Sequence, residues 1–202
     1  MRKFDGDRLV LASHNEGKLA ELRAMLAPLG IAVTPASAEG LSAPDETEAT
    51  FEGNAVLKAR AACAATALPA LADDSGLAVT ALGGQPGIYS ARWAAPDGDH
   101  APAIARVLAG LEGQEDRSAR FVCALALAWP DGHVETARGE APGVIVNAPR
   151  GDGGFGYDPI FLPDAERGGR ERTFAELTRE EKRADNHRAR AMAAMMTGVF
   201  AR

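Results

Sequence analysis

The sequence predicts an α/β fold in a single domain, because strand-like apolar runs alternate with helical patterns along its 202 residues. The first apolar run, Arg8–Ala12, is typical of a buried strand. A stripe of leucines at helical spacing follows it: Leu19, Leu22, Leu26 and Leu29. The run Arg120–Trp129 has the continuous apolar character of a central strand that is covered on both faces. We therefore expect a sheet flanked by helices.

The remaining elements of the first half alternate in the same way. Ile31–Thr34 predicts a second strand, and a loop with two prolines and a glycine follows it. A helix is expected from about Thr50 to Thr66. Pro69–Ala72 predicts a short strand, and Gly76–Leu82 continues in an extended form.

In the second half, Pro130–His133 is a turn that predicts a hairpin between two strands. Gly139–Val146 is expected to add another strand. An amphipathic helix is expected between these elements and the first half: Ile104, Val107, Leu108 and Leu111 mark its apolar side. Thr178 and Glu181 have the spacing of a capping box, and a last helix is expected to begin near Asn186.

Composition excludes several classes of protein. The net charge of −6 argues against a general nucleic-acid surface. No apolar run is long enough to span a bilayer, and the N-terminus lacks a signal-type stretch, so we expect a cytoplasmic protein without membrane contact. Cys63 and Cys123 lie in apolar surroundings and are expected to be core residues.

A polar loop with a glycine joins the first strand to the first helix. It comprises Ser13, His14, Asn15, Glu16, Gly17 and Lys18. A helix N-terminus offers free N–H groups and a positive dipole end to an anion. Lys18 opposes that dipole, and a bound phosphate would explain its position. The alternative is an ordinary helix cap, since the loop lacks the pattern of a P-loop.

Two adjacent carboxylates, Asp73 and Asp74, follow the strand-like run that ends at Ala72. Acidic pairs at strand ends often hold Mg²⁺. The alternative is a solvated turn, because Asp, Ser and Gly all favour turns. On the predicted helix upstream, Asn54 and Lys58 share one face and are candidates to line a polar cleft.

A glycine-rich segment near residue 155 is a candidate base-binding site. Glycines allow close approach to a flat ligand, Phe155 offers a stacking face, and Asp158 offers an acceptor for a purine edge. The alternative is a tight loop with Phe155 in the core. His187 and Arg188 in the first turn of the last helix add a second candidate anion site.

Six motifs occur in the order found in one family: Ser13–Lys18, Thr50–Ala55 with Lys58–Arg60, Ala72–Leu77, Gly83–Arg92, Gly153–Pro159, and Glu176–Thr178 through His187–Arg188. Because all six motifs are present in this order, the chain resembles the inosine triphosphate/xanthosine triphosphate pyrophosphatases. The resemblance spans nearly the whole sequence.

The resemblance implies a mixed, elongated central β-sheet flanked by helices, with two lobes around an active-site cleft, all within one domain of residues 1–202. It also implies a homodimer and a requirement for Mg²⁺. The implied reaction splits ITP, dITP or XTP into the nucleoside monophosphate and pyrophosphate. The alternatives are a related pyrophosphatase with another base preference and a nucleotide-binding regulator without hydrolysis.

The resemblance also implies roles for individual residues. Asp74 would be the general base, with Asp73 and Lys58 in support, and Asp74 and Glu46 would hold the metal. Asp45, the neighbour of Glu46, is the alternative metal ligand. The residues implied to bind substrate are Ser13, His14, Asn15, Glu16, Gly17, Lys18, Ser75, Phe155, Gly156, Tyr157, Asp158, Lys182, His187 and Arg188. A catalytic Asp beside a metal is expected to keep a low pKa.

Overall fold

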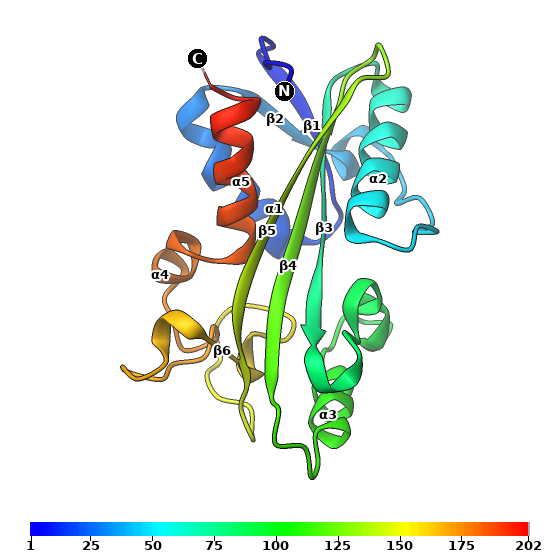
Figure 1. Ribbon diagram of the computed structural model, residues 1–202. Helices are drawn as coiled ribbons and strands as arrows, with labels where there is room; N and C mark the ends of the chain where they lie inside the picture. The colour runs from blue at the N-terminus through cyan, green and yellow to red at the C-terminus, as the bar shows by residue number, and fades with distance from the viewer. Residues whose placement is uncertain (202) are drawn as a thin grey trace. The chain divides into compact units, whose positions relative to one another are not determined.

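The computed structural model describes residues 1–201, which form a mixed α/β fold (Figure 1). Its strands are β1 Arg8–Ala12, β2 Ala32–Pro35, β3 Ala70–Val79, β4 Ser118–Ala128, β5 Val134–Ile145 and β6 Phe161–Pro163. Its helices are α1 Glu16–Leu26, α2 Phe51–Thr66, α3 Ala101–Gly110, α4 Arg179–Ala184 and α5 His187–Gly198. Short 3₁₀ turns connect several of them.

The strands form a sheet in the order β2-β1-β3-β4-β5-β6. β1 pairs in parallel with both β2 and β3, whereas β5 pairs antiparallel with β6. The sheet is therefore mixed, as the resemblance implied. Its parallel part contains the β1–α1–β2 crossover, which delivers the polar loop after β1 to the carboxyl edge of parallel strands.

The chain divides into two compact units. Unit 1 comprises Met1–Asp74, Cys123–Gly139 and the residues from Arg188 onward, and unit 2 comprises Ser75–Val122 and Glu140–His187. β3, β4 and β5 each contribute residues to both units. A single domain of two lobes stays a prediction.

In unit 1, α1 and α5 cover one face of the strands and α2 lies on the other (Figure 1). Alternate residues of β1 show the reason, because Leu9 and Leu11 face the α1–α5 side and join the same core as Leu22 and Met195. α2 buries a row of small residues instead: Ala55, Ala59, Ala62 and Cys63.

Unit 2 has an aromatic core of its own. Phe121 of β4 contacts Phe161 edge-on, with ring centroids 4.8 Å apart, and stacks on Phe174 at 5.8 Å. Val107 of α3 and Leu77 of β3 pack in the same cluster. Rigid aromatic packing of this kind fixes the loops that follow β5 and β6.

The capping signals in the sequence are confirmed. Asn15 and Thr50 cap α1 and α2, each accepting a hydrogen bond of 3.0 Å from the backbone three residues on. Thr178 and Glu181 form the predicted capping box of α4. The last helix begins at His187, next to the predicted cap. Both cysteines are buried, as expected.

Two strand predictions need correction. β3 does not break at the acidic pair but runs for 10 residues through it. β5 is one strand from Val134 to Ile145, so the expected separate strand from Gly139 is its continuation. Turn-forming residues misled both predictions, because within a sheet the ladder hydrogen bonds and tertiary ion pairs outweigh a local turn preference.

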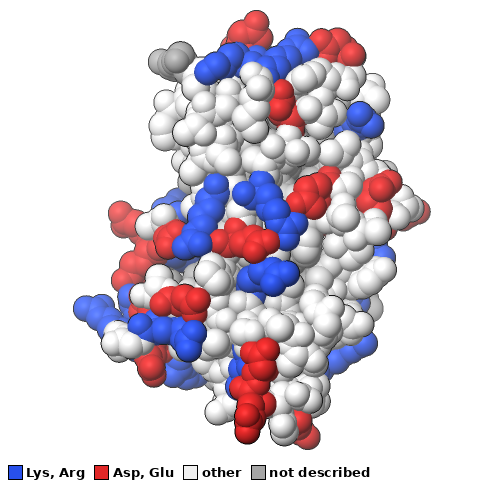
Figure 2. Space-filling view, viewed as in Figure 1, with Lys and Arg blue, Asp and Glu red and all other residues white. Residues whose placement is uncertain are grey.

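The viewed surface carries charges of both signs. Figure 2 shows basic and acidic side chains beside one another on this face, without a broad region of one sign. None of the helices within residues 1–201 has the length and apolarity needed to cross a membrane.

Candidate active site

The acidic pair lies inside strand β3 and is buried. Asp73 is 1% exposed and Asp74 is 5% exposed. Successive residues of a strand point to opposite faces, so the two carboxylates enter different surroundings. The solvated-turn interpretation of the pair is therefore wrong.

Asp74 meets a lysine and a second carboxylate. Lys58 Nζ donates to Asp74 Oδ1 and to Glu46 Oε1, each at 2.7 Å. Asn54, one turn before Lys58 on α2, places its amide nitrogen 3.5 Å from Asp74 Oδ2. Its amide oxygen accepts from the backbone N–H of Glu48 at 3.0 Å and so ties down the acidic loop. The predicted α2 face thus meets the acidic pair.

The pKa values of the two carboxylates in this cluster are shifted in opposite directions. Burial raises the pKa of Asp74 to about 6 against the opposing charges of Lys58 and Lys18. Burial also acts to raise the pKa of Glu46, but the Lys58 hydrogen bond and charge outweigh it, so that this pKa is lowered. Asp74 is therefore the better proton acceptor near neutral pH. The low pKa expected of Asp74 would require the charge of a bound ion.

Asp73 has a different set of partners. Lys18 Nζ lies 2.7 Å from Oδ1, and Arg188 Nε donates to Oδ2 at 2.7 Å. The Cys123 thiol also donates to Oδ2 at 3.1 Å. Burial alone would raise the pKa of Asp73, but the charges of Arg188 and Lys18 hold it well below its ordinary value. Asp73 is therefore a fixed counter-ion rather than a base.

The loop after β1 forms a capped helix start. Ser13 Oγ accepts from the backbone N–H of Asn15 at 3.3 Å, and Asn15 Oδ1 accepts from that of Lys18. His14 is exposed and its Nε2 lies 2.8 Å from the carbonyl oxygen of Leu41. Glu16 and Gly17 open α1 itself, where the first N–H groups of a helix have no intrahelical partner.

The residues fit a divalent metal of the Mg²⁺ type. Within residues 1–201 no group of three or more His, Cys, Asp or Glu side chains forms a complete metal cage. Mg²⁺, however, is commonly held by one or two carboxylates together with substrate phosphates and water. Glu46 and Asp74 converge on one ammonium and supply such a pair, whereas Asp45 is exposed.

A second cluster lies in unit 2. Lys182 of α4 and Asp158 form a buried ion pair with 2.6 Å between Nζ and Oδ2. The same Asp158 oxygen accepts from the backbone N–H of Phe155 at 2.8 Å. Lys182 Nζ also lies 4.4 Å from the centroid of the Phe155 ring, which is half-buried. Gly154 has φ of +73°, and a Cβ there would collide with the Asp158 carboxylate. The glycine-rich loop therefore closes on Asp158.

Four other predicted site residues of unit 2 have distinct settings. Tyr157 is a core residue whose hydroxyl donates to the Ser90 carbonyl at 2.8 Å. His187 is buried and stacks on Phe121, with 4.8 Å between ring centroids. Ser75 is half-buried directly after Asp74. Gly156, which directly precedes Tyr157 in the sequence, has a positive φ of 68°.

Arg188 is placed differently from the expected phosphate or base ligand. Its side chain is fully buried and bonds Asp73 and Glu21. Sequence reasoning missed Glu21. A signal was available, because Glu21 stands three residues after Lys18 on the same face of α1.

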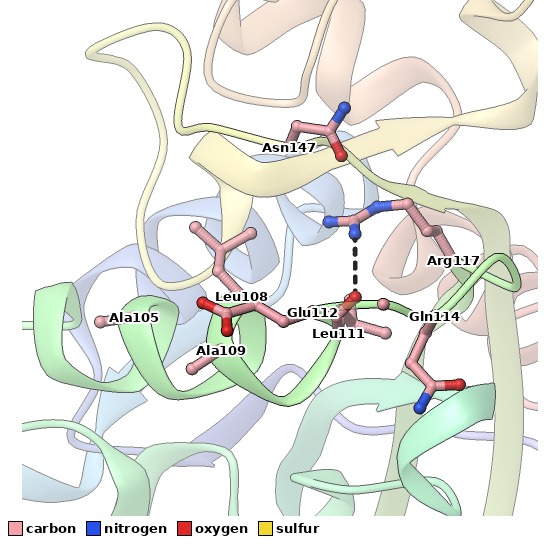
Figure 3. Close-up of a pocket in the computed structure, with 9 residues that line it drawn as sticks. Ala105, Leu108, Ala109, Leu111, Glu112, Gln114, Arg117 and Asn147 are labelled. Atoms are coloured by element: carbon pink, nitrogen blue, oxygen red, sulfur yellow. Dashed lines mark hydrogen bonds between the residues drawn. The ribbon is translucent and has the colours of Figure 1, made fainter.

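A separate pocket of about 530 Å³ in unit 2 contains none of these residues. Its lining includes Leu108 of α3 together with Glu112, Arg117 and Asn147 (Figure 3). Arg117 donates to the backbone carbonyls of Leu111, Ile145 and Val146. Since its main polar group serves to tie loops together, we assign this pocket no function.

The chain is similar to known proteins over almost its whole length. A model of the Ham1 family matches residues 9–198. The chain belongs to the Ham1 family.

Curated relatives of this Ham1-family chain share about half of its residues. It is 55% identical to the dITP/XTP pyrophosphatase of Rhodospirillum centenum, over 99% of this chain and 98% of that protein. It is 51% identical to the dITP/XTP pyrophosphatase of Gluconobacter oxydans, over 97% of this chain and 93% of that protein. The resemblance seen in the motifs is thereby confirmed.

A solved structure supports the fold. The chain matches a HAM1 protein from Coxiella burnetii with a TM-score of 0.85 and 42% identity, over 94% of this chain and 96% of that one. The expected fold class, a mixed sheet flanked by helices, is confirmed.

Proposed function

We propose that this Ham1-family chain is a nucleoside triphosphate pyrophosphohydrolase. It hydrolyses non-standard purine nucleoside triphosphates (dITP, XTP and ITP) to the monophosphate and pyrophosphate. The observation that carries the proposal is the cluster of Asp74, Lys58 and Glu46, which provides a base, a cation and a second carboxylate. The two relatives described above are both dITP/XTP pyrophosphatases, and this chain matches each of them over nearly its whole length.

The chemistry of unit 1 suits the hydrolysis of a phosphoric anhydride. Such bonds resist hydrolysis because their charged oxygens repel a nucleophile, so the protein has to neutralise charge and orient water. In the metal-free protein burial raises the pKa of Asp74 to about 6, and its ionised form would accept the proton of the attacking water. Lys58 and Lys18 oppose the phosphate charge, and the first turn of α1 offers backbone donors.

A divalent ion belongs to this chemistry. Glu46 and Asp74 would hold Mg²⁺, which when bound neutralises phosphate charge and lowers the pKa of water. The lysine that now joins the two carboxylates would then share them with the ion. Asp73 stays ionised and keeps Lys18 in place.

Unit 2 supplies groups that suit a purine base. Phe155 offers a ring for stacking, and Lys182 offers a donor for a 6-oxo group. Adenine presents a donor at that position, and a buried donor that faces another donor costs about 1–3 kcal/mol. Hypoxanthine and xanthine are therefore favoured over adenine.

The test is pyrophosphate release from ITP, dITP, XTP, GTP, ATP and dUTP, each with Mg²⁺ and again with a chelator. We expect release from the first three, loss of it with chelator, and slow reaction of ATP. Equal rates for all bases would refute the base selectivity, and faster reaction of dUTP would favour the pyrimidine alternative. Absence of release from every nucleotide would favour the non-hydrolysing regulator.

We also propose that the protein is a homodimer acting in the cytoplasm, where its nucleotide substrates are found. The family resemblance supports the dimer, and the N-terminus without a signal-type stretch supports the cytoplasmic location. Sedimentation velocity at micromolar concentration is expected to give twice the mass of one chain, and a single species of one chain's mass would refute the dimer.

A further inference from the structure

Four charged side chains of unit 1 alternate in sign, and the proposed reaction leaves one of them, Glu21, without a role. Arg188 donates from Nε to Asp73 Oδ2 at 2.7 Å and from Nη1 to Glu21 Oε2 at 2.6 Å. Lys18 Nζ lies 2.7 Å from the other Asp73 oxygen, Oδ1. The four therefore form a row that begins and ends on one face of α1.

Because these side chains are buried, the arrangement of the row depends on the balance between its positive and negative charges. The side chains of Arg188 and Asp73 are both 0% exposed, and that of Glu21 is 12% exposed. A buried cation is tolerated when carboxylates satisfy it, and removal of one partner leaves an excess charge in a low dielectric. Arg188 has two carboxylates to satisfy it only while Glu21 keeps its charge.

Loss of the Glu21 carboxylate would change how Arg188 binds Asp73. A guanidinium prefers to grip a carboxylate with two parallel N–H donors, which engages both oxygens. One of these oxygens, Oδ1, is the one that holds Lys18. Arg188 would then compete with Lys18 for it.

The Asp73 anchor leaves Lys18 able to bind a phosphate as well. An ammonium has three donors, and the ion pair with Asp73 engages one of them. The Lys18 side chain is 15% exposed, so the ion pair holds it in place without burying it completely. A lysine that first has to be ordered binds more weakly, by about fivefold to thirtyfold.

We propose that Glu21 is a positioning residue: through Arg188 and Asp73 it holds Lys18 in the orientation in which Lys18 binds the triphosphate. The inference rests on the proposed function of this site. It assigns Arg188 to the same task, in place of direct contact with substrate.

The test is the variant Glu21→Gln, with two readouts. Calorimetric titration with inorganic tripolyphosphate is expected to show a Kd raised about fivefold to thirtyfold, and KM for ITP is expected to rise alike. The kcat stays within about twofold, because Asp74 and Lys58 are untouched. In a Lys18→Met background, Glu21→Gln is expected to change Kd no further.

Glu52→Gln is the matched control, because it removes a carboxylate from another ion pair of unit 1, that with Arg138. It is expected to leave both Kd and KM unchanged. Where Glu21→Gln fails to fold, Glu21→Asp keeps the charge, shortens its reach by one methylene, and is expected to show a smaller loss in the same direction.

An unchanged Kd in folded Glu21→Gln, or effects of Glu21→Gln and Lys18→Met that multiply, would overturn the inference while the proposed function stands. Wild-type protein that neither binds tripolyphosphate nor releases pyrophosphate would overturn the proposed function itself.

Discussion

Asp73 and Asp74 are neighbours on β3, yet their surroundings move their pKa in opposite directions. Arg188 and Lys18 hold the pKa of Asp73 low, whereas burial raises that of Asp74 to about 6. These opposite shifts support our proposal that Asp73 is a structural counter-ion and Asp74 is the base. Such a division is the pattern by which one site provides both a fixed charge and a base.

Asp74→Asn is expected to abolish pyrophosphate release and to change how the stability of the metal-free fold depends on pH. The folded-state pKa of about 6 lies above the ordinary value of 3.8, so Asp74 costs stability as the pH rises through this window. The stability of the variant relative to wild type is therefore expected to rise by about 1–3 kcal/mol between pH 4 and pH 6.

Thermal unfolding with a chelator at pH 7.5 and at pH 3.5 measures that difference. An equal difference between variant and wild type at both pH values would show that the pKa of Asp74 is not raised. Residual turnover by the variant would show that Asp74 is not the base.

At the scale of elements, a capped helix in each unit carries a lysine of that unit's candidate cluster. α2 begins after Thr50 and carries Lys58, and α4, of only six residues, begins after Thr178 and carries Lys182. A short helix depends heavily on its cap, because it has few internal hydrogen bonds. The caps thus contribute to function by holding a lysine in position.

Thr50→Ala and Thr178→Ala are each expected to cost about 1 kcal/mol in urea unfolding, since each removes one cap acceptor. Their kinetic effects are expected to differ. Thr50→Ala lowers kcat for all nucleotides, whereas Thr178→Ala lowers the ratio of kcat/KM for ITP over ATP. Identical kinetic changes in the two variants would contradict this assignment of helices to tasks.

For the whole molecule, sequence reasoning predicted the helices and their caps, because periodicity and cap residues are local signals. It divided β3 and β5 and missed β6. It placed Lys58, Glu46 and Asp74 together only through the family resemblance. It missed the ion pair of Arg188 with Glu21, which are 167 residues apart in the chain. The spacing of Lys18 and Glu21 on α1 is a local signal, but the contact of Arg188 with Glu21 depends on how α5 packs on α1, which a single sequence does not show.

Both carboxylates lie within strand β3, and this limits how the length of the strand can vary among related proteins. Side chains on a strand alternate, so a deletion of one residue between Ala70 and Asp73 would exchange the faces of the two carboxylates. Asp74 would then take the place of Asp73 beside Arg188, and Ser75 would take the place of Asp74 beside Lys58, so the cluster would lose its base. Functional relatives are therefore expected to vary in the loops before this strand, while the number of residues within it stays constant.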